Sequence, residues 1–204
     1  MKPFLIEIDG PEYAGKSTTV QELKKHLEGF KFFRTPGSAP IAEKLRPIVK
    51  ECSMTPEVAV GIMLASMGDF YQYVAKENSN SITDRGLISS IIYQGHLNEC
   101  FDKCYNLYNT CFNTLKEIVE TNFDYYRIIL SIPPETVIKR KSIRDAVESN
   151  EKDKYDNMNY EGHARLCKYY HSIGTGCGYY DKFLNSDKTY MVECDNLSQE
   201  EVVQ

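Results

Sequence analysis

Apolar runs alternate along the chain with segments in which apolar residues recur every three or four positions. The short apolar runs indicate strands, at residues 4–8, 31–35, 81–84, 125–132 and 188–195. The intervening periodicity predicts helices, at about 18–27, 41–51, 55–77, 87–122 and 134–145. Such alternation favours a parallel sheet with helices on both faces. We therefore expect an α/β fold with a central parallel sheet of about five strands, as a single domain over residues 1–204.

Two segments depart from simple alternation. Residues 87–122 are long enough to form two helices, and their apolar stripe from about 97 to 119 predicts a core-facing side. Residues 145–159 are almost entirely polar and follow the basic run "KRKSIR" at 139–144. A plain solvated loop is one interpretation; a small lid over residues 140–160 is the one we adopt.

Composition narrows the class of protein. With 204 residues, 42% of them hydrophobic, the chain can build a full core. No stretch approaches 18 consecutive apolar residues and "MKPFLIEIDG" does not have the pattern of a signal peptide, so we expect no membrane span and a cytoplasmic location. The net charge of −5 gives no support for a nucleic-acid partner. The basic run indicates either a local anionic ligand or a solvated helix face.

The seven cysteines include no C-x-x-C pair. Cys100, Cys104 and Cys111 have helical spacing, which predicts small apolar residues on one helix face. A zinc site that uses His96 or His163 is disfavoured because structural zinc sites have tighter ligand pairs. Reduced thiols are the simpler interpretation.

The segment "GPEYAGKS" follows the first strand and matches the phosphate-binding pattern G-x-x-x-x-G-K-[ST]. Its glycines let backbone N–H groups point at phosphate oxygens, and the next helix adds its positive end. Lys16 would reach the β- and γ-phosphates, and Ser17 would bind Mg²⁺. The motif predicts a P-loop NTPase fold that binds a nucleotide, without separating kinases from GTPases and ATP-driven machines. The expected nucleotide-binding residues are Gly10, Pro11, Glu12, Tyr13, Ala14, Gly15, Lys16, Ser17 and Thr18.

The base-reading tetrapeptide N-K-x-D of Ras-type GTPases does not occur in the chain. The segment "TDRGLISSIIYQG" at 83–95 instead resembles the block D-R-[YF]-x-x-S-x-x-A-[YF]-Q-G of the thymidylate kinase family. The segments "RTPGSAPIAEKLR", "SIPPETVIKRKSIR" and "VECDNLSQEEV" resemble other motifs of that family, in the same order. The resemblance spans nearly the whole chain, and it implies a kinase that phosphorylates dTMP with ATP and Mg²⁺ and that forms a homodimer.

The resemblance also implies roles for individual residues. Arg85 would hold the acceptor phosphate with help from Arg34 or Arg46, and Tyr93 would lie against the deoxyribose. Glu12 would contact the sugar 3′-hydroxyl. The expected catalytic residues are Lys16, Arg85, Arg140 and Arg144, and the expected metal ligands are Ser17 and Asp84. The expected acceptor site comprises Glu12, Arg34, Pro36, Arg46, Leu64, Gly68, Arg85, Ser89, Ser90 and Tyr93.

The chain departs from the family pattern around the base. Leu64 stands at the position of a base-stacking aromatic residue, and Gly68 stands at that of a base-binding arginine, for which Phe70 or Gln72 could compensate. Gly86 replaces the aromatic residue after Asp-Arg. Such departures suit a divergent member, for example one of viral origin. They leave open a kinase for dUMP or a 5-substituted pyrimidine nucleotide, a kinase for another metabolite, and a nucleotide-binding protein without transfer activity.

Overall fold

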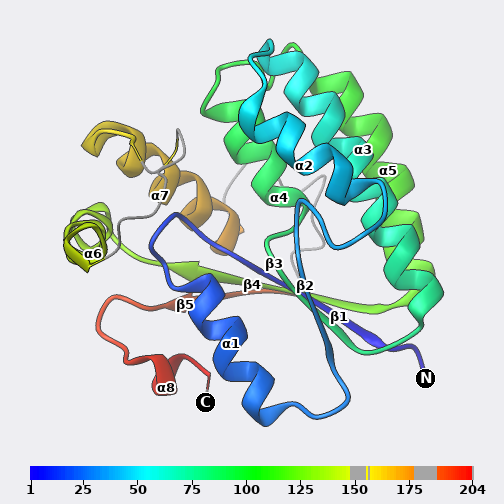
Figure 1. Ribbon diagram of the computed structural model, residues 1–204, viewed down its shortest axis with the longest axis horizontal. Coiled ribbons are helices and arrows are strands. Elements are labelled where there is room, and N and C mark those ends of the chain that lie inside the picture. The colour runs from blue at the N-terminus through cyan, green and yellow to red at the C-terminus, as the bar shows by residue number, and fades with distance from the viewer. Residues whose placement is uncertain (148–154, 156, 177–187, 204) are drawn as a thin grey trace.

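The central sheet follows the alternation of the sequence. The computed structural model describes residues 1–147, 155, 157–176 and 188–203. Within them five strands form one parallel sheet in the order β2-β3-β1-β4-β5 (Figure 1). The strands are β1 Phe4–Asp9, β2 Lys31–Arg34, β3 Ser81–Asp84, β4 Asp124–Ser131 and β5 Thr189–Glu193. The predicted α/β fold with five parallel strands is confirmed.

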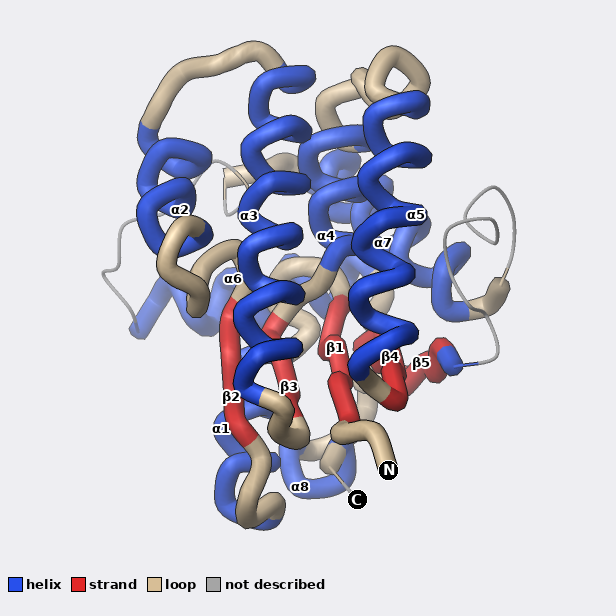
Figure 2. Tube along the Cα trace, turned by 90° about the vertical axis from the view of Figure 1, so that its right-hand side faces the viewer, coloured by secondary structure: helices blue, strands red, loops and turns tan. Residues whose placement is uncertain are grey.

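Helices cover both faces of this sheet. Figures 1 and 2 show α2, α3 and α5 on one side and α1 and α8 on the other. The helices are α1 Lys16–His26, α2 Ala42–Glu51, α3 Pro56–Glu77, α4 Leu87–Ser90, α5 Tyr105–Asn122, α6 Pro134–Val147, α7 Tyr160–Gly174 and α8 Gln199–Val202. The predicted lid, at 140–160, includes the last turns of α6 and the start of α7, while 148–154 and 156 lie outside the described residues.

Strand β1 lies at the centre of the sheet and is buried on both faces. Leu5 packs into the apolar cluster beneath α3 and α5, whereas Ile8 packs into the cluster beneath α1. Two carboxylates of the same strand, Glu7 and Asp9, are also fully buried. A charged residue is fully buried in a protein only when other polar groups compensate it, so these two positions call for partners.

Helix α3 is long and apolar enough, by length and composition alone, to cross a membrane, and half of its most apolar window is buried inside the protein. Val60, Met67 and Phe70 of this helix are fully buried in the apolar core that α3 shares with α5. A core helix of a globular protein passes the same test, and α3 uses its apolar residues for this packing.

The predicted helical stretch 87–122 forms two helical segments, as its length allowed, with a run of turns between them. Helix α4 continues into a π-helical turn, η1 Ile91–His96, and the chain then makes turns until α5 begins at Tyr105. Glu99 has a positive φ of 56°, and the Asn98 amide donates to the carbonyl of Tyr93 at 2.6 Å, which ends the helical path there.

The prediction that three cysteines share one helix face is therefore wrong. Cys100 and Cys104 precede α5, while Cys111 lies within it. The first two are still buried as small apolar residues, at 2% and 5% exposure. The cysteines within the described residues are free thiols.

Candidate active site

The phosphate-binding loop joins β1 to α1. Gly10 has a φ of 151°, and a Cβ there would lie 2.5 Å from the carbonyl oxygen of Leu130 on β4. Only glycine therefore allows the loop to leave the sheet at this point. Gly15 has a φ of 98°, a value that favours glycine, and it precedes the first residue of α1. The predicted strand, loop and helix thus occur in the predicted order.

Lys16 lies beneath its own loop. Its Nζ donates to the carbonyl oxygens of Gly10 at 2.9 Å and Pro11 at 2.6 Å, and the residue is only 5% exposed. Burial, with the nearby charge of Arg85, lowers the pKa of Lys16 to about 8. The ammonium group is held in a site that is poor in water, where its attraction for an anion is strong.

Ser17 and Asp84 come together from two elements. Because β3 runs parallel to β1 and pairs Asp84 with Ile8, Asp84 ends beside the start of α1. The Ser17 hydroxyl donates to Asp84 Oδ2 at 2.6 Å, while the buried Oδ1 accepts no hydrogen bond from the described residues. A hydroxyl and a carboxylate with a spare oxygen suit a hard cation such as Mg²⁺. The predicted pair of metal ligands is therefore in one place.

Arg85, Glu12 and Tyr93 form a cluster over the loop. An Arg85 Nη2 donates to Glu12 Oε1 at 2.5 Å, and the Tyr93 hydroxyl donates to the same oxygen at 3.0 Å. The Arg85 guanidinium also lies 5.1 Å from the centre of the Tyr93 ring. Burial alone would raise the pKa of Glu12, but the charges of Arg85 and Lys16 lower it to about 2. Glu12 is thus ionised at neutral pH.

Two cavities meet at this cluster. One, of about 700 Å³, is lined by the loop from Glu12 onward, by Arg140 and Arg144, and by the segment after β5. The other, of about 110 Å³, lies between the Arg85 turn, the segment after β2 and helix α3. Glu12, Arg34 and Arg85 line both. A phosphate held in the first cavity can therefore reach a molecule held in the second.

Most predicted acceptor residues line the smaller cavity. They are Glu12, Arg34, Pro36, Arg46, Arg85, Ser89 and Tyr93. Arg46 also donates a hydrogen bond to the carbonyl of Pro36, which follows a cis peptide bond. The hydrogen bond from Arg46 holds the loop between β2 and α2 against the cavity.

The structure does not bring Leu64, Gly68 and Ser90 to that cavity. Leu64 and Ser90 are buried in the core, and a Cβ on Gly68 would meet Leu115 of α5 at 3.7 Å. Met63 lines the cavity from α3 instead, one position before Leu64. One residue is a rotation of about 100° on a helix, enough to move a side chain from a cavity to the core.

The two arginines of α6 lie against the phosphate-binding loop. Arg140 donates to the carbonyls of Tyr13 at 3.2 Å, Ala14 at 3.3 Å and Cys194 at 2.7 Å. Arg144 donates to the Tyr13 hydroxyl at 3.1 Å, and its guanidinium lies 4.3 Å from the centre of that ring. The expected cationic pair is thus placed beside the larger cavity.

Several lining residues escaped the sequence prediction. The segment after β5 contributes Cys194, Leu197, Ser198 and Val202 to the larger cavity. Ser198 and Glu201 form a capping box at the start of α8, and the pattern S-x-x-E in "LSQEEV" is a recognisable signal for it. In the smaller cavity, Gln94 had a signal as part of the Y-Q-G end of the block at 83–95, whereas Val49, Met63 and Tyr155 had none.

A buried polar network lies behind the Arg85 turn. Glu7 accepts hydrogen bonds from the hydroxyls of Tyr71 and Tyr125, and its Oε2 lies 3.7 Å from Arg127 Nε. Burial raises the pKa of Glu7, while Arg127 acts against this. A Cβ on Gly86 would lie only 2.1 Å from Glu7 Oε2. The carboxylate therefore supports the turn from below and occupies the space of any larger residue at 86.

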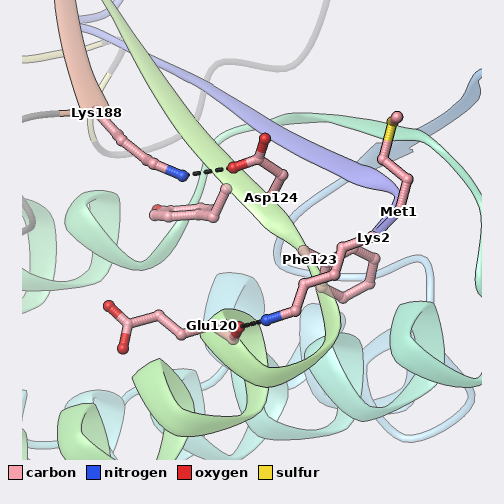
Figure 3. Close-up of a pocket in the computed structure, with 7 residues that line it drawn as sticks. Met1, Lys2, Glu120, Phe123, Asp124 and Lys188 are labelled. Atoms are coloured by element: carbon pink, nitrogen blue, oxygen red, sulfur yellow. Dashed lines mark hydrogen bonds and ion pairs between the residues drawn. The ribbon is translucent and has the colours of Figure 1, made fainter.

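A separate cleft of about 450 Å³ lies where β1 and β4 begin, near the N-terminus (Figure 3). Lys188 forms an ion pair with Asp124, and Lys2 donates to the backbone carbonyl of Glu120. Both lysines thus contact groups of the protein itself. The cleft lies at the amino ends of the parallel strands, whereas the phosphate-binding loop lies at their carboxyl ends. We therefore assign the cleft no part in the site.

Fold and site together define a nucleotide-binding protein of the P-loop class, with a second cavity beside the phosphate loop. The family model for thymidylate kinase matches residues 8–176. The chain belongs to the thymidylate kinase family.

Individual relatives agree with this assignment. A thymidylate kinase of Chlorobaculum tepidum is 31% identical over 188 residues, which cover 84% of each chain. One of Chlorobaculum parvum is 28% identical over 83% of this chain and 82% of its own. A solved structure of a thymidylate kinase from Candida albicans superposes with a TM-score of 0.65 at 16% identity, covering 99% of this chain and 88% of that one. This last likeness supports the fold.

Proposed function

We propose that the protein transfers the γ-phosphoryl group of ATP to dTMP and so forms dTDP. The observation that carries this proposal is the junction of the two cavities at Glu12, Arg34 and Arg85. A nucleotide-binding protein without transfer activity needs only the first cavity. Family membership and the named relatives support dTMP as the acceptor.

On the donor side, backbone N–H groups of residues 12–18 and the ammonium of Lys16 bind the phosphates of ATP. Transfer of a phosphoryl group requires positioning and charge stabilisation far more than covalent chemistry. Arg140 and Arg144 supply positive charge from α6, beside a loop whose variable positions, Tyr13 and Ala14, carry none.

On the acceptor side, Arg85 is the central residue, and Arg34 and Arg46 lie in the same cavity. Guanidinium groups bind phosphate oxygens in a forked geometry, which orients the attacking oxygen. Glu12 and Tyr93 line the same cavity as Arg85, and there they would contact the sugar of the acceptor. Glu12 is bonded to Arg85, so it also orients this guanidinium before the acceptor binds.

Ser17 and Asp84 fit a Mg²⁺ ion, since Asp84 has a buried oxygen that the described residues leave without a hydrogen bond. Mg²⁺ takes few protein ligands and completes its shell with water and substrate phosphates. Among the described residues, no group of three or more His, Cys, Asp or Glu side chains is placed to bind a metal. A Mg²⁺ ion that takes most of its ligands from water and phosphates does not require such a group. When bound, the ion would neutralise charge on the β- and γ-phosphates.

A coupled assay of ADP formation with dTMP, dUMP, dCMP, dGMP and dAMP tests the proposal. We expect turnover with dTMP; binding of ATP without turnover on any acceptor would support the non-catalytic alternative. Arg85→Ala should lower kcat/KM for dTMP by about 100-fold or more while ATP binding changes little. Turnover that survives this change would overturn the role of Arg85. Arg165→Ala, at an exposed ion pair with Glu99, is the matched control.

We further propose that the protein is one domain with a lid over residues 140–160, acts in the cytoplasm and forms a homodimer. Val58 on α3 and Leu107 on α5 are apolar side chains that are 52% and 42% exposed, and the two helices pack together. These side chains support the proposal of an apolar contact with a second copy of the chain. Sedimentation equilibrium tests the dimer, and we expect twice the monomer mass. A monomer at every concentration would contradict it.

A further inference from the structure

Tyr13 contacts the arginines of α6 in two different ways. Its carbonyl accepts from Arg140 at 3.2 Å, and its hydroxyl accepts from Arg144 at 3.1 Å. The Arg144 guanidinium also lies over the ring, 4.3 Å from its centre. Arg140 and Arg144 are four residues apart and so project from the same side of α6. One loop residue therefore contacts both cations.

The ring of Tyr13 is itself held in place. Tyr13 has a positive φ of 64°, which turns its side chain out of the path of the loop toward α6 and α7. Its ring meets that of His163 on α7 edge to face, with centres 6.1 Å apart, and His163 is fully buried. The ring on which Arg144 lies thus also packs against a buried residue of α7.

Tyrosine suits this position because it offers a π-face and a hydroxyl acceptor to one guanidinium. Phenylalanine would keep the face and lose the acceptor, and alanine would lose both. An arginine has several rotatable bonds, and a fixed contact removes the entropy cost of ordering it during the reaction. The phosphoryl group is transferred next to this loop, where a cation must already be in place.

We propose that Tyr13 is a positioning residue, which holds the Arg144 guanidinium beside the transferring phosphoryl group. This inference rests on the proposed phosphoryl transfer. Tyr13 then acts through Arg144, and its loss lowers the rate of transfer more than it weakens binding of either nucleotide. Through a neutral side chain, the loop thereby gains a second cation beside Lys16, which its variable positions Tyr13 and Ala14 do not supply.

A double-mutant cycle with dTMP and ATP tests this. Tyr13→Ala should lower kcat by about 5- to 30-fold, from the loss of the cation–π contact and the hydrogen bond, with smaller changes in either KM. Tyr13→Phe should fall between this variant and the wild type. In the Arg144→Ala background, Tyr13→Ala should have almost no further effect. Full additivity of the two changes, or an unchanged kcat in Tyr13→Ala, would overturn the inference.

Tyr160→Phe is the matched control, because Tyr160 also ties its hydroxyl to α6, at Glu135 Oε1 with a distance of 2.5 Å, away from the loop. Its kcat should stay at the wild-type value; an equal loss in this variant would assign the effect to general loosening of α6.

A second measurement does not depend on turnover. Phenylglyoxal should modify Arg144 several-fold faster in Tyr13→Ala than in the wild type, with the adduct located by mass spectrometry. An unchanged rate of modification would overturn the contact itself. A wild-type protein that fails to phosphorylate dTMP would instead overturn the proposed function, so the two failures are distinguishable.

Discussion

Substitution of Gly86 by alanine is a direct test of how the Arg85 turn is supported. The added Cβ would lie 2.1 Å from Oε2 and 2.2 Å from Cδ of Glu7, whereas Cβ contacts below 3.0 Å essentially never occur. Glu7 is fully buried and bonded to two tyrosine hydroxyls, so its carboxylate has no free direction in which to move. The turn must therefore shift by about 1 Å, and Arg85 moves with it.

A displacement of about 1 Å in a residue that orients a substrate can lower the rate by about 100-fold. We expect Gly86→Ala to lower kcat/KM for dTMP by roughly 10- to 100-fold and to lower the free energy of unfolding by about 1–3 kcal/mol. The kinetic change is measured by coupled ADP release with varied dTMP, and the stability change by urea denaturation.

Gly61→Ala is the matched control. Gly61 lies in α3, and a Cβ there would meet no atom within 4 Å. This variant should keep the wild-type rate and gain about 0.5–1 kcal/mol of stability, because alanine favours the helix over glycine. If Gly86→Ala were as active and as stable as Gly61→Ala, the proposed support of the turn by Glu7 would be wrong.

Four further outcomes are expected. Because Lys16 has a pKa of about 8, below its ordinary value of 10.5, kcat/KM for ATP should fall as the pH rises above 8; a flat profile up to pH ~10 would contradict this. Glu12 has a pKa lowered from 4.5 to about 2, so its stabilising effect, present above pH 4.5, should be lost as the pH falls toward 2. Glu12→Gln should therefore flatten the acid limb of a denaturation series, and an unchanged limb would refute the assignment. Asp84→Asn should raise the Mg²⁺ concentration for half-maximal rate by about tenfold or more, and an unaltered Mg²⁺ titration would exclude Asp84 from the metal site. Met63→Ala should raise KM for dTMP by about tenfold, whereas Leu64→Ala should cost about 2–5 kcal/mol of stability with little change in KM; the reverse pattern would restore Leu64 to the cavity.

The sequence predicted those parts of the site that lie on a local pattern. The phosphate-binding loop depends on glycines at fixed spacing between a strand and a helix, and the structure has them there. Asp84 could be placed beside Ser17 because a residue at the end of a parallel strand faces the same edge as the loop. The first prediction needed only the order of elements along the chain, whereas the role of Asp84 was implied by the resemblance to the family.

Other features depend on contacts between distant segments, and the sequence does not specify these. Met63 faces the cavity and Leu64 faces the core because of the way α3 is rotated against α5. A shift of one residue in matching this helix to the family pattern exchanges the two positions. The turn at 97–104 follows from the amide of Asn98 and the positive φ of Glu99, which interrupt a strong helical pattern. The partners of Glu7 come from α3 and β4 and have no signal in its own neighbourhood.

At Lys16, the free-energy cost of removing the ammonium group from water falls on folding and not on nucleotide binding. Its ammonium group is already removed from water and rests on two carbonyls of its own loop before any nucleotide arrives. The lowered pKa shows that the charged form is disfavoured in the folded protein relative to water, so the apoprotein is less stable for having it. That desolvation is complete before ATP binds, and the phosphates meet a preorganised charge. The phosphates of the nucleotide thus compensate a buried charge that the folded protein leaves unfavourable. Saturation with ATP should therefore raise the unfolding temperature.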